Sequence, residues 1–528
     1  MRLTTCTLLG FGSITAVLAI ATPKESRAEP DLLTDIQAIQ RYWGQITPYN
    51  DTPASYFGVE NTGLPYGCGF EQVHILHRHG ARYPTGSEED AVNDDLFAAK
   101  VGSIQAKEGS EAFSGPLAFL NTWKDYLGTN LLLPTGAAQD YTSGTQFWNQ
   151  RGRLLYNATI GQSYYNASFT NGTARPLPLL RTTSQERILD SALAWSNGFF
   201  GPENATSKYN LLVIPEGGTE NNTLASYDSC FNDDVDAIGS TGDNAVFTYI
   251  AGGFLDAATN RLNGYLINGQ YSFNQNDTYA MMELCSYEYA TFGSSDFCGL
   301  FTEAEWEGFE YTSDLEYYYD YSYGSAIGRA QGIGYLQEVI ARINQQYITS
   351  SNTSVNSTLD NNAETFPLGQ RFYLDMSHDD ILVSVVTAES VDYFKESLPI
   401  NANPPPADRH FRLSYLTPFG ARLYTEVIGC ASASPAEVQN PYTQYYPGSN
   451  GYNPDNAPHK FIRQLWNNAV VPLATIEGGY CSGRTDGMCA LSSFLASQAD
   501  AETKANYQYG CFANYTDTAG NGDGSVFA

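Results

Sequence analysis

Short apolar runs alternate along this chain with segments of helical spacing. Residues 71–77 and 371–376 carry apolar stretches of strand length, typical of a buried parallel sheet. Residues 276–289 and 325–344 repeat their apolar positions at helical intervals. This pattern predicts an α/β fold in which helices alternate with the strands of an open sheet.

Residues 177–201 predict a strand that ends near Leu180, followed by a capped helix. Thr183 is the predicted N-cap, because Glu186 three residues later completes a capping box. Gly198 and Gly201 are predicted to mark the end of this helix. Its apolar face consists of Ile188, Leu189, Ala192 and Leu193.

The remaining segments complete the predicted order. A short helix is expected over 32–43, helical segments over 243–262, and a hairpin from 411–416 and 422–428. Residues 352–365 are expected to form a polar surface loop, and residues 402–406 a proline-rich linker.

The length of 528 residues allows two or three domains. Helical segments dominate residues 203–335, between two parts that contain the predicted strands. We therefore predict an α/β catalytic domain from residues 22–202 and 336–528, with a smaller, mostly helical domain inserted at 203–335.

The N-terminus carries the pattern of a secretory signal. Arg2 precedes an apolar run over 8–21, and Ala19-Ile20-Ala21 is a small-x-small cleavage site, so residues 1–21 are the predicted signal peptide. Asn-x-Ser/Thr sequons agree with export and predict N-glycans. They lie at Asn50, Asn157, Asn166, Asn171, Asn204, Asn221, Asn276, Asn352, Asn356 and Asn514. We expect a secreted protein, extracellular or held in the cell wall.

The cysteines fit an oxidising compartment. Nine are present, and eight remain once Cys6 leaves with the signal peptide. Spacing favours only the short Cys481–Cys489 pair and leaves the other pairings open. No cysteine pair has zinc-site spacing combined with histidines, so no metal is expected.

Charge narrows the range of partners. The chain has 57 acidic residues against 27 lysines and arginines, a formal net charge of -30. Such a chain repels nucleic acid and anionic membranes, and neither is an expected partner.

Two of the scarce cations flank a histidine. Arg78 and Arg82 lie on either side of His79, directly after the predicted strand 71–77. Arginine presents a planar fork of donors that matches phosphate oxygens, and histidine can act as a nucleophile or carry a proton. The segment therefore indicates a site for a small dianion such as phosphate, rather than a basic surface turn.

Two other segments supply matching chemistry. Arg187 lies near the positive pole of the predicted helix, where a bound anion would offset an unfavourably placed cation. His378 and Asp379 end the predicted strand 371–376. Open α/β sheets bind ligands at the carboxyl ends of their strands, so we expect these residues to meet His79 there.

The chemistry sets conditions on two pKa values. A nucleophilic histidine must be neutral, and Arg78 and Arg82 are expected to lower the pKa of His79. Asp379 must be protonated to act as an acid, which an acidic working pH would favour, as would an incoming phosphate.

On these residues the chain resembles the histidine acid phosphatases, specifically the secreted fungal branch that includes phytases. The resemblance rests on R-H-G-A-R-Y-P-T at 78–85, on Arg187 in S-Q-E-R-I and on His378-Asp379, with support from 115–123 and 195–201. It implies a phosphoglycerate-mutase-like α/β sandwich with a helical insert. It also implies a secreted acid phosphomonoester hydrolase without a cofactor. The expected substrate is phytate (myo-inositol hexakisphosphate), and the alternative is a broad-specificity acid phosphatase of the same mechanism.

The resemblance also implies residue roles. His79 would attack phosphorus and form a phosphohistidine, and Asp379 would protonate the leaving alcohol. The phosphoryl oxygens would be held by Arg78, Arg82, Arg187 and His378. Four disulfides are implied, namely Cys68–Cys430, Cys230–Cys511, Cys285–Cys298 and Cys481–Cys489.

The chain departs from the family in ways that bear on substrate preference. Residues 387–390 replace the usual A-L-G-like segment, and Asp380 is expected to add negative charge beside Asp379. Ala81 resembles the phytase subgroup. Phytate, however, needs a wide basic pocket, for which Lys100 and Lys107 are the nearest candidates.

Two rival functions use the same residues. His77 and His79 could be metal ligands of an amidohydrolase-like enzyme, although further ligands are not evident. A secreted glycoprotein could also bind phosphorylated ligands without catalysis. Outside the site, we expect His74 and His77 to be structural and His410 and His459 to be bystanders, while Arg181 could support the site from behind.

Overall fold

The computed structural model describes residues 30–59, 63–86, 91–218, 220–437, 448, 450–515, 520 and 522–526. The predicted signal peptide lies outside these residues. Leu32–Ala528 form one compact unit, and every helix and strand named below belongs to it.

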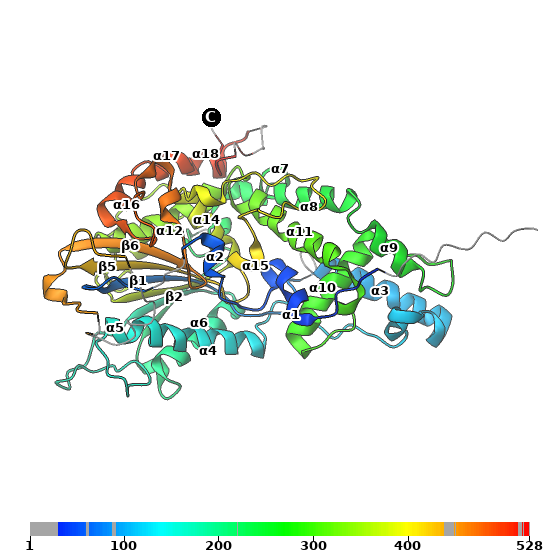
Figure 1. The fold of residues 1–528 in the computed structure, drawn as a ribbon, viewed down its shortest axis with the longest axis horizontal. Coiled ribbons are helices and arrows are strands. Elements are labelled where there is room, and N and C mark those ends of the chain that lie inside the picture. Colours follow the sequence, from blue (N-terminus) through cyan, green and yellow to red (C-terminus); the bar gives the residue numbers. More distant parts are fainter. Residues whose placement is uncertain are drawn as a thin grey trace, which may run out of the picture. The chain divides into compact units, whose positions relative to one another are not determined.

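A mixed sheet of eight strands, counted over the described residues, forms the centre of this unit (Figure 1). Its order is β3-β2-β4-β1-β5-β6-β7, and β8 pairs with β6. β3, β2, β4 and β1 run parallel, whereas β5 is antiparallel to both β1 and β6. The strands are β1 (Cys68–Arg78), β2 (Leu179–Thr183), β3 (Asn210–Ile214), β4 (Phe372–Ser377), β5 (Arg422–Cys430), β6 (His459–Trp466), β7 (Ala469–Val470) and β8 (Cys489–Ala490).

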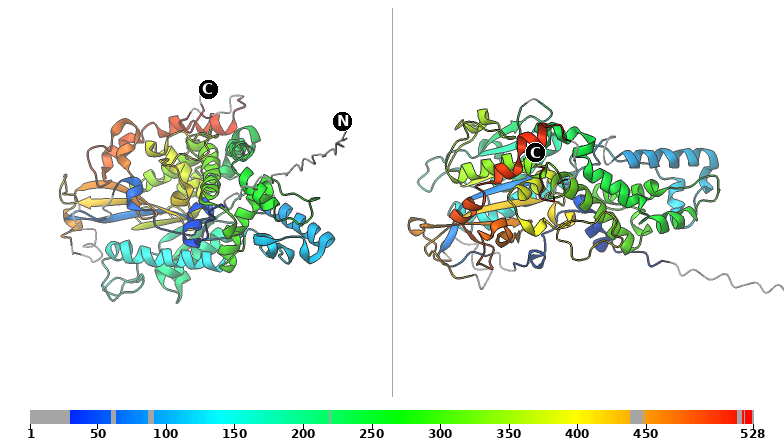
Figure 2. Two further views of the ribbon diagram at one scale, coloured as in Figure 1. Left: turned by 45° about the vertical axis from the view of Figure 1, so that its right-hand side comes forward. Right: turned by 90° about the horizontal axis from the view of Figure 1, so that it is seen from above.

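Helices cover both faces of the sheet. α4 and α6 pack on each other below it, and α12 and α14 lie above it (Figures 1 and 2). The α-helices before β3 are α1 (Ile36–Ile39), α2 (Ala54–Phe57), α3 (Ala91–Glu108), α4 (Pro134–Phe147), α5 (Arg153–Leu155) and α6 (Glu186–Phe200). Those between β3 and β4 are α7 (Asp236–Gly239), α8 (Thr241–Ala251), α9 (Asp256–Asn263), α10 (Gln275–Phe292), α11 (Glu303–Tyr321), α12 (Gly328–Ile343) and α13 (Ser357–Asp360). Those after β4 are α14 (Asp379–Ala388), α15 (Leu413–Leu416), α16 (Leu491–Ser497), α17 (Ala501–Ala505) and α18 (Tyr507–Phe512).

Aromatic side chains fill the space between the sheet and α4/α6. Phe372 of β4 lies 4.8 Å from Phe199 of α6, measured between ring centroids, and Phe199 stacks on Trp195 at 5.2 Å. All three side chains are fully buried. Burying such large rings contributes several kcal/mol, which fixes α6 and the residues at its N-terminus against the sheet.

The α/β fold is confirmed, and most of the predicted elements are present. β1 and β4 match the two predicted strands, and α10 and α12 match the predicted helices. The helical segment predicted at 243–262 is broken, because Gly253 has a φ of 91° between α8 and α9. The short helix predicted at 32–43 is reduced to α1 and two 3₁₀ turns.

The predicted capping box of α6 is wrong. Thr183 is the last residue of β2 and pairs with Ile214, so it lies two residues before the actual N-cap of α6. The N-cap is Gln185, which makes no side-chain capping bond, and Glu186 is the first helical residue. Gly198 lies inside the helix rather than at its end; Gly201 follows the last helical residue as predicted.

The predicted hairpin is also wrong. Leu413–Leu416 form one helical turn, α15, and Leu413 N donates to Asp314 Oδ1 of α11 at 2.7 Å. Arg422–Cys430 do form a strand, β5, but both of its edges pair elsewhere, with β1 and β6.

The division into a catalytic domain and an inserted domain at 203–335 stays a prediction. That range holds α7 to α11, of which α8 packs on α11, while α10 packs on α3 from outside the range. It also holds β3, a member of the central sheet, at its start.

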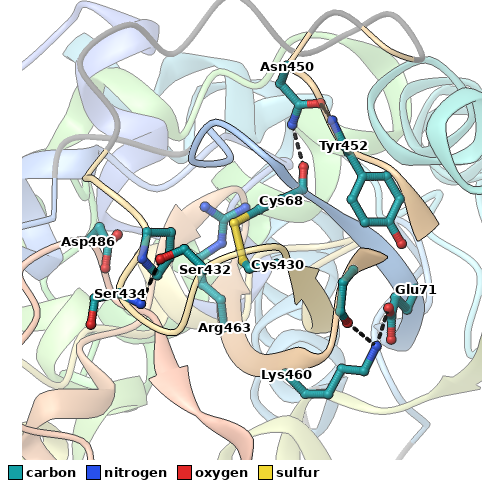
Figure 3. The surroundings of a disulfide bond; sticks show 12 residues. Cys68, Glu71, Cys430, Ser432, Ser434, Asn450, Tyr452, Lys460, Arg463 and Asp486 are labelled. Carbon is teal, nitrogen blue, oxygen red and sulfur yellow. Dashed lines mark hydrogen bonds and ion pairs between the residues drawn. A yellow bond between two sulfur atoms is a disulfide. The ribbon is translucent and has the colours of Figure 1, made fainter. Parts of the chain in front are cut away.

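The four disulfides implied by the resemblance are all present. Figure 3 shows the bond between Cys68 and Cys430, which face each other across β1 and β5. It joins residues 362 positions apart, so it removes much conformational freedom from the unfolded chain. Beside it, Asn450 donates to the carbonyl of Cys68, and Lys460 pairs with Glu71 (Figure 3).

No helix among the described residues has the length and apolar character needed to cross a bilayer.

Candidate active site

The predicted site residues lie at the carboxyl ends of three parallel strands. His79 follows β1, His378 follows β4 as the N-cap of α14, and Arg187 is the second residue of α6, which comes after β2. Arg78 pairs in register with Ser377, and His79 N donates to Ser377 O at 3.2 Å. The segments of β1 and β4 therefore leave the sheet side by side, as open α/β sheets do at ligand sites.

The His79 ring is buried, with a relative exposure of 1% for the residue. Its Nδ1 lies 2.8 Å from the carbonyl oxygen of Gly80. Because a carbonyl only accepts, Nδ1 carries the proton of the neutral ring and Nε2 carries the lone pair. Burial holds the pKa of His79 well below its ordinary value, and the charges of Arg78, Arg187, Arg82 and His378 lower it further. The ring therefore stays neutral in acid, as expected, with burial as the larger cause.

Gly80 brings the loop after His79 close to the N-terminus of α4. A Cβ at this position would lie 2.4 Å from the carbonyl oxygen of Gly136, so only glycine allows the contact. Gly80 N donates to Asp140 Oδ2 and to Ser191 Oγ, each at 3.1 Å. The loop that carries His79 is thereby fixed from both α4 and α6.

Arg78 is fully buried and held from several sides. It donates to the carbonyl oxygens of Gln45 and Thr417, and its guanidinium lies 4.7 Å from the centroid of the Phe419 ring. Its Nη2 makes an ion pair with Asp379 Oδ2 at 2.7 Å. These contacts orient the guanidinium beside both His79 and Asp379.

Arg82 and Arg187 place two further cations near His79. Arg82 donates to Tyr83 O at 3.0 Å and to Tyr287 OH at 3.4 Å. Arg187 is partly buried, and its Nε has no hydrogen-bond partner among the described residues. Burial and the charge of Arg82 lower the pKa of Arg187. Two like charges in a partly dry site are mutually unfavourable, and a bound anion would relieve that cost.

Asp379 Oδ2 makes an ion pair with Arg78 and accepts a hydrogen bond from Tyr317. Arg78 Nη2 and Tyr317 OH each lie 2.7 Å from Oδ2. Burial raises the pKa of this carboxyl, but Arg78, Arg82 and the Tyr317 hydroxyl outweigh burial and hold it below its ordinary value. Asp379 is thus a carboxylate while Arg78 is paired with it.

His378 contacts two residues that the sequence analysis did not identify. Its Nε2 lies 2.9 Å from Glu216 Oε1 and 3.0 Å from the Tyr227 hydroxyl. Tyr227 also donates to Glu216 Oε2 at 3.2 Å. The rings of His378 and His79 are 6.1 Å apart between centroids.

The expected negative charge of Asp380 requires a correction. Burial raises the pKa of Asp380 to about 7, with the nearby charge of Asp379 adding to that effect and the charge of His378 opposing it. The carboxyl is therefore neutral in acid and adds no negative charge beside Asp379 there.

The other histidines turn away from this chemistry. His77 Nδ1 contacts the carbonyl oxygen of Arg78, and its Nε2 contacts Ser143 Oγ at 2.8 Å, so neither ring nitrogen faces the site. His74 stacks on Tyr373. Burial lowers the pKa of both histidines to about 3. Among the described residues, no group of three or more His, Cys, Asp or Glu could hold a metal ion.

Arg181 does not reach the site. It is buried at the centre of an ion-pair cluster, with Asp375 Oδ1 at 2.5 Å and Glu338 Oε2 at 2.5 Å. Arg342 pairs with the other oxygen of Asp375 at 2.6 Å. This cluster joins β2, β4 and α12.

Each of the two lysines proposed for a wide phosphate pocket contacts another side chain. Lys100 makes an ion pair with Asp277 of α10, and Lys107 lies 5.9 Å from the ring centroid of Tyr271. Both lie on α3, outside the contacts of His79 described above.

These features define a class of protein: a hydrolase with a neutral, buried histidine inside a ring of arginines and a carboxyl group beside it. A profile of the histidine phosphatase superfamily (branch 2) matches residues 69–446 of the chain. The chain belongs to this family. The predicted family and reaction class, hydrolysis of phosphomonoesters, are thereby confirmed.

Curated relatives match over nearly their whole length. Phytase A of Emericella nidulans is 30% identical over 494 residues, covering 90% of this chain and 91% of the relative. The thiamine-repressible acid phosphatase pho4 of Schizosaccharomyces pombe is 29% identical, covering 88% of each chain. The crystal structure of the phytase from D. castellii has the same fold, with a TM-score of 0.66 and 21% identity over 90% of this chain and 88% of that one.

Proposed function

We propose that this chain is a secreted acid phosphomonoester hydrolase that acts through a phosphohistidine on His79, with phytate among its substrates. The observation that carries the proposal is the convergence of Arg78, Arg82 and Arg187 on one neutral imidazole. Three guanidinium groups can hold a phosphoryl dianion and stabilise the charge of its transfer.

In the first step, the His79 Nε2 lone pair attacks phosphorus, and the bond from phosphorus to the ester oxygen breaks. The arginines and His378 hold the three phosphoryl oxygens in line for this displacement. The leaving oxygen takes a proton from Asp379 and departs as the alcohol. Water then attacks the phosphohistidine while Asp379 accepts a proton from it, and the N–P bond breaks to release phosphate.

Asp379 must be protonated before it can act as an acid. Its low pKa in this structure depends on the ion pair with Arg78. A phosphate that draws the Arg78 guanidinium toward itself removes that stabilisation of the carboxylate and adds negative charge beside it. Both changes raise the pKa of Asp379, so substrate binding and an acidic medium together prepare the acid.

Kinetic measurements with phytate and with p-nitrophenyl phosphate decide between a phytase and an enzyme for simpler esters. The Phytase A relatives favour phytate. A broad acid phosphatase is the second candidate, and the commitment of Lys100 to Asp277 and of Lys107 to Tyr271 favours it. Similar kcat/KM for phytate and p-nitrophenyl phosphate would support phytase activity. Phytate turnover far below that of simple esters would support the broad enzyme.

The test of the proposed function is phosphate release at about pH 5 by wild type, by His79→Ala and by the control His459→Ala. His79→Ala is expected to lose turnover by at least about 10⁴-fold because the nucleophile is absent. His459 lies at the start of β6, away from the site, and its variant is expected to keep wild-type activity. Full activity of folded His79→Ala would reject the mechanism, and inactive wild type would favour the non-catalytic binding protein.

Metal chelation distinguishes the proposed mechanism from the remaining rival, the amidohydrolase-like enzyme. The proposed mechanism needs no metal, so EDTA should leave the rate unchanged. Loss of activity that a divalent metal restores would favour the amidohydrolase-like alternative. Secretion and N-glycosylation are part of the proposal, and they are supported by the disulfides and by the sequons.

A further inference from the structure

Glu216 occupies a position that the phosphate chemistry does not explain. It lies two residues beyond β3, the neighbour of β2 in the sheet, and its side chain is 7% exposed. A buried carboxylate is costly unless it is paired, and a carboxylate in a phosphate site opposes an incoming anion. Its presence beside Arg187 and His378 therefore needs a compensating role.

The contacts of Glu216 point to that role. Oε1 lies 2.9 Å from His378 Nε2, and Oε2 accepts from the Tyr227 hydroxyl at 3.2 Å. Glu216 N donates to Ser184 Oγ at 3.0 Å, which ties its backbone to the segment between β2 and α6. The carboxylate is thus fixed at both oxygens and at its backbone, with one oxygen on the imidazole.

The contact determines what His378 can present to a phosphate. With Nε2–H donated to Glu216, only Nδ1 of the ring remains for another partner. A carboxylate at 2.9 Å is a strong acceptor for Nε2–H, and it thereby fixes the orientation of the ring.

We propose that Glu216 is a positioning residue, which holds the His378 ring by its Nε2 so that Nδ1 is available to the phosphoryl group. The proposal rests on the proposed function and names a residue outside the sequence motifs on which the resemblance was based. The Tyr227 hydroxyl supports the arrangement, because it contacts both members of the pair.

The charge of Glu216 agrees with this role. Burial raises the pKa of Glu216, but the hydrogen bond and charge of His378, with Thr183 and Arg187, outweigh burial and leave the pKa below its ordinary value. The carboxylate therefore persists in acid, where the enzyme is proposed to work. The other charged or titratable groups that act on this pair are His79, Asp228, Asp379 and Asp380.

The test compares Glu216→Gln with Glu220→Gln. Glu220 is an exposed residue on the same segment, and among the described residues its carboxylate accepts one long bond, 3.4 Å, from Asn356. Glutamine keeps the shape of Glu216 but removes the negative charge that strengthens its hydrogen bond with His378 Nε2. We expect KM for p-nitrophenyl phosphate and the inhibition constant of inorganic phosphate to rise about tenfold, with a smaller change in kcat at the acid optimum. Glu220→Gln is expected to match wild type in all three.

The split between KM and kcat gives a readout that a merely structural role would not move. Loss of folded enzyme lowers the apparent kcat and leaves KM unchanged, whereas a misplaced His378 raises KM and the inhibition constant of phosphate.

The results separate this inference from the proposed function. A folded, active Glu216→Gln with wild-type KM and phosphate inhibition overturns the inference and leaves the proposed function intact. If Glu216→Gln does not fold, Glu216→Asp decides, because the shorter side chain withdraws the carboxylate from His378 Nε2. Unchanged KM and phosphate inhibition in that variant would likewise overturn the inference. Inactive wild type would reject the proposed function itself.

Discussion

At the residue scale, the site combines groups that the sequence identifies with groups that it does not. His79, Arg78 and Arg82 stand in one motif after a strand, so their chemistry could be predicted. Tyr317 and Glu216 contact Asp379 and His378 from segments far away in sequence. One feature of the sequence could have pointed to Glu216: an apolar run at 211–214 ends just before it. That run was not identified as a strand, although strand ends mark this edge of the sheet.

Asp379→Asn tests the proposed acid. Asparagine keeps the size of the side chain but cannot deliver the proton to a leaving alcohol. Alkyl phosphates should therefore lose about 10²–10⁴-fold in kcat/KM, because their leaving groups need that proton. p-Nitrophenyl phosphate, whose leaving group departs readily as an anion, should lose far less. Steady-state kinetics on both esters provide the measurement, and equal losses for the two would contradict the role.

Asp140 predicts a dependence of stability on pH. The carboxyl is fully buried beneath the loop of His79, and burial raises its pKa to about 8 from 3.8. Between pH 3.8 and about pH 8, Asp140 has released its proton in the unfolded chain but still binds it in the folded chain. This group therefore makes the free energy of unfolding fall with rising pH.

Asp140→Asn removes that titration and can still accept from Gly80 N. The stability of the variant relative to wild type is expected to increase as pH rises from about 5 to about 7.5, by at most about 1.4 kcal/mol per pH unit. Urea unfolding of both proteins at several pH values measures the difference. Parallel pH curves would show that Asp140 is not held protonated.

At the element scale, α4 and α6 approach through glycines. A Cβ on Gly144 would lie 2.1 Å from the carbonyl oxygen of Trp195, and one on Gly198 would lie 2.0 Å from that of Tyr141. The backbones are therefore in direct contact. This approach brings the N-terminal turn of α6, which carries Arg187, toward the loop of His79 and the start of α4.

Gly144→Ala is expected to push α4 and α6 apart and to destabilise the protein by about 1–3 kcal/mol. Gly102→Ala is the matched control, because a Cβ there meets nothing within 4 Å on the exposed side of α3. It should be neutral or stabilising by up to about 1 kcal/mol. Thermal unfolding compares the two, and an equally stable Gly144→Ala would contradict the tight contact.

The same elements show what the sequence could and could not predict. Long buried segments such as β1, β4 and α12 were predicted because their apolar pattern extends over a whole element. The start of α6 and the supposed hairpin depended on one or two residues, and there tertiary pairing decided the outcome. Thr183 stays in the sheet because β3 pairs with it, and β5 joins strands distant in sequence, which a local pattern does not reveal.

At the scale of the whole molecule, a strongly acidic chain concentrates several of its few cations at one edge of its sheet. The formal net charge is -30, yet Arg78, Arg82 and Arg187 all act on one histidine. Three strands, a helix terminus and the segment after β3 must fold together to create this arrangement. The family resemblance identified its members, and the three-dimensional fold shows how burial and paired charges prepare them.

The central claim is that His79 carries the phosphoryl group during turnover. Its most direct test is rapid alkaline quenching of the enzyme with labelled substrate, followed by mapping of the labelled peptide by mass spectrometry. The account predicts one labelled site, a phosphohistidine at residue 79, which is absent from His79→Ala. Label on another residue, or steady turnover with no labelled intermediate in wild type and undiminished turnover in folded His79→Ala, would contradict it.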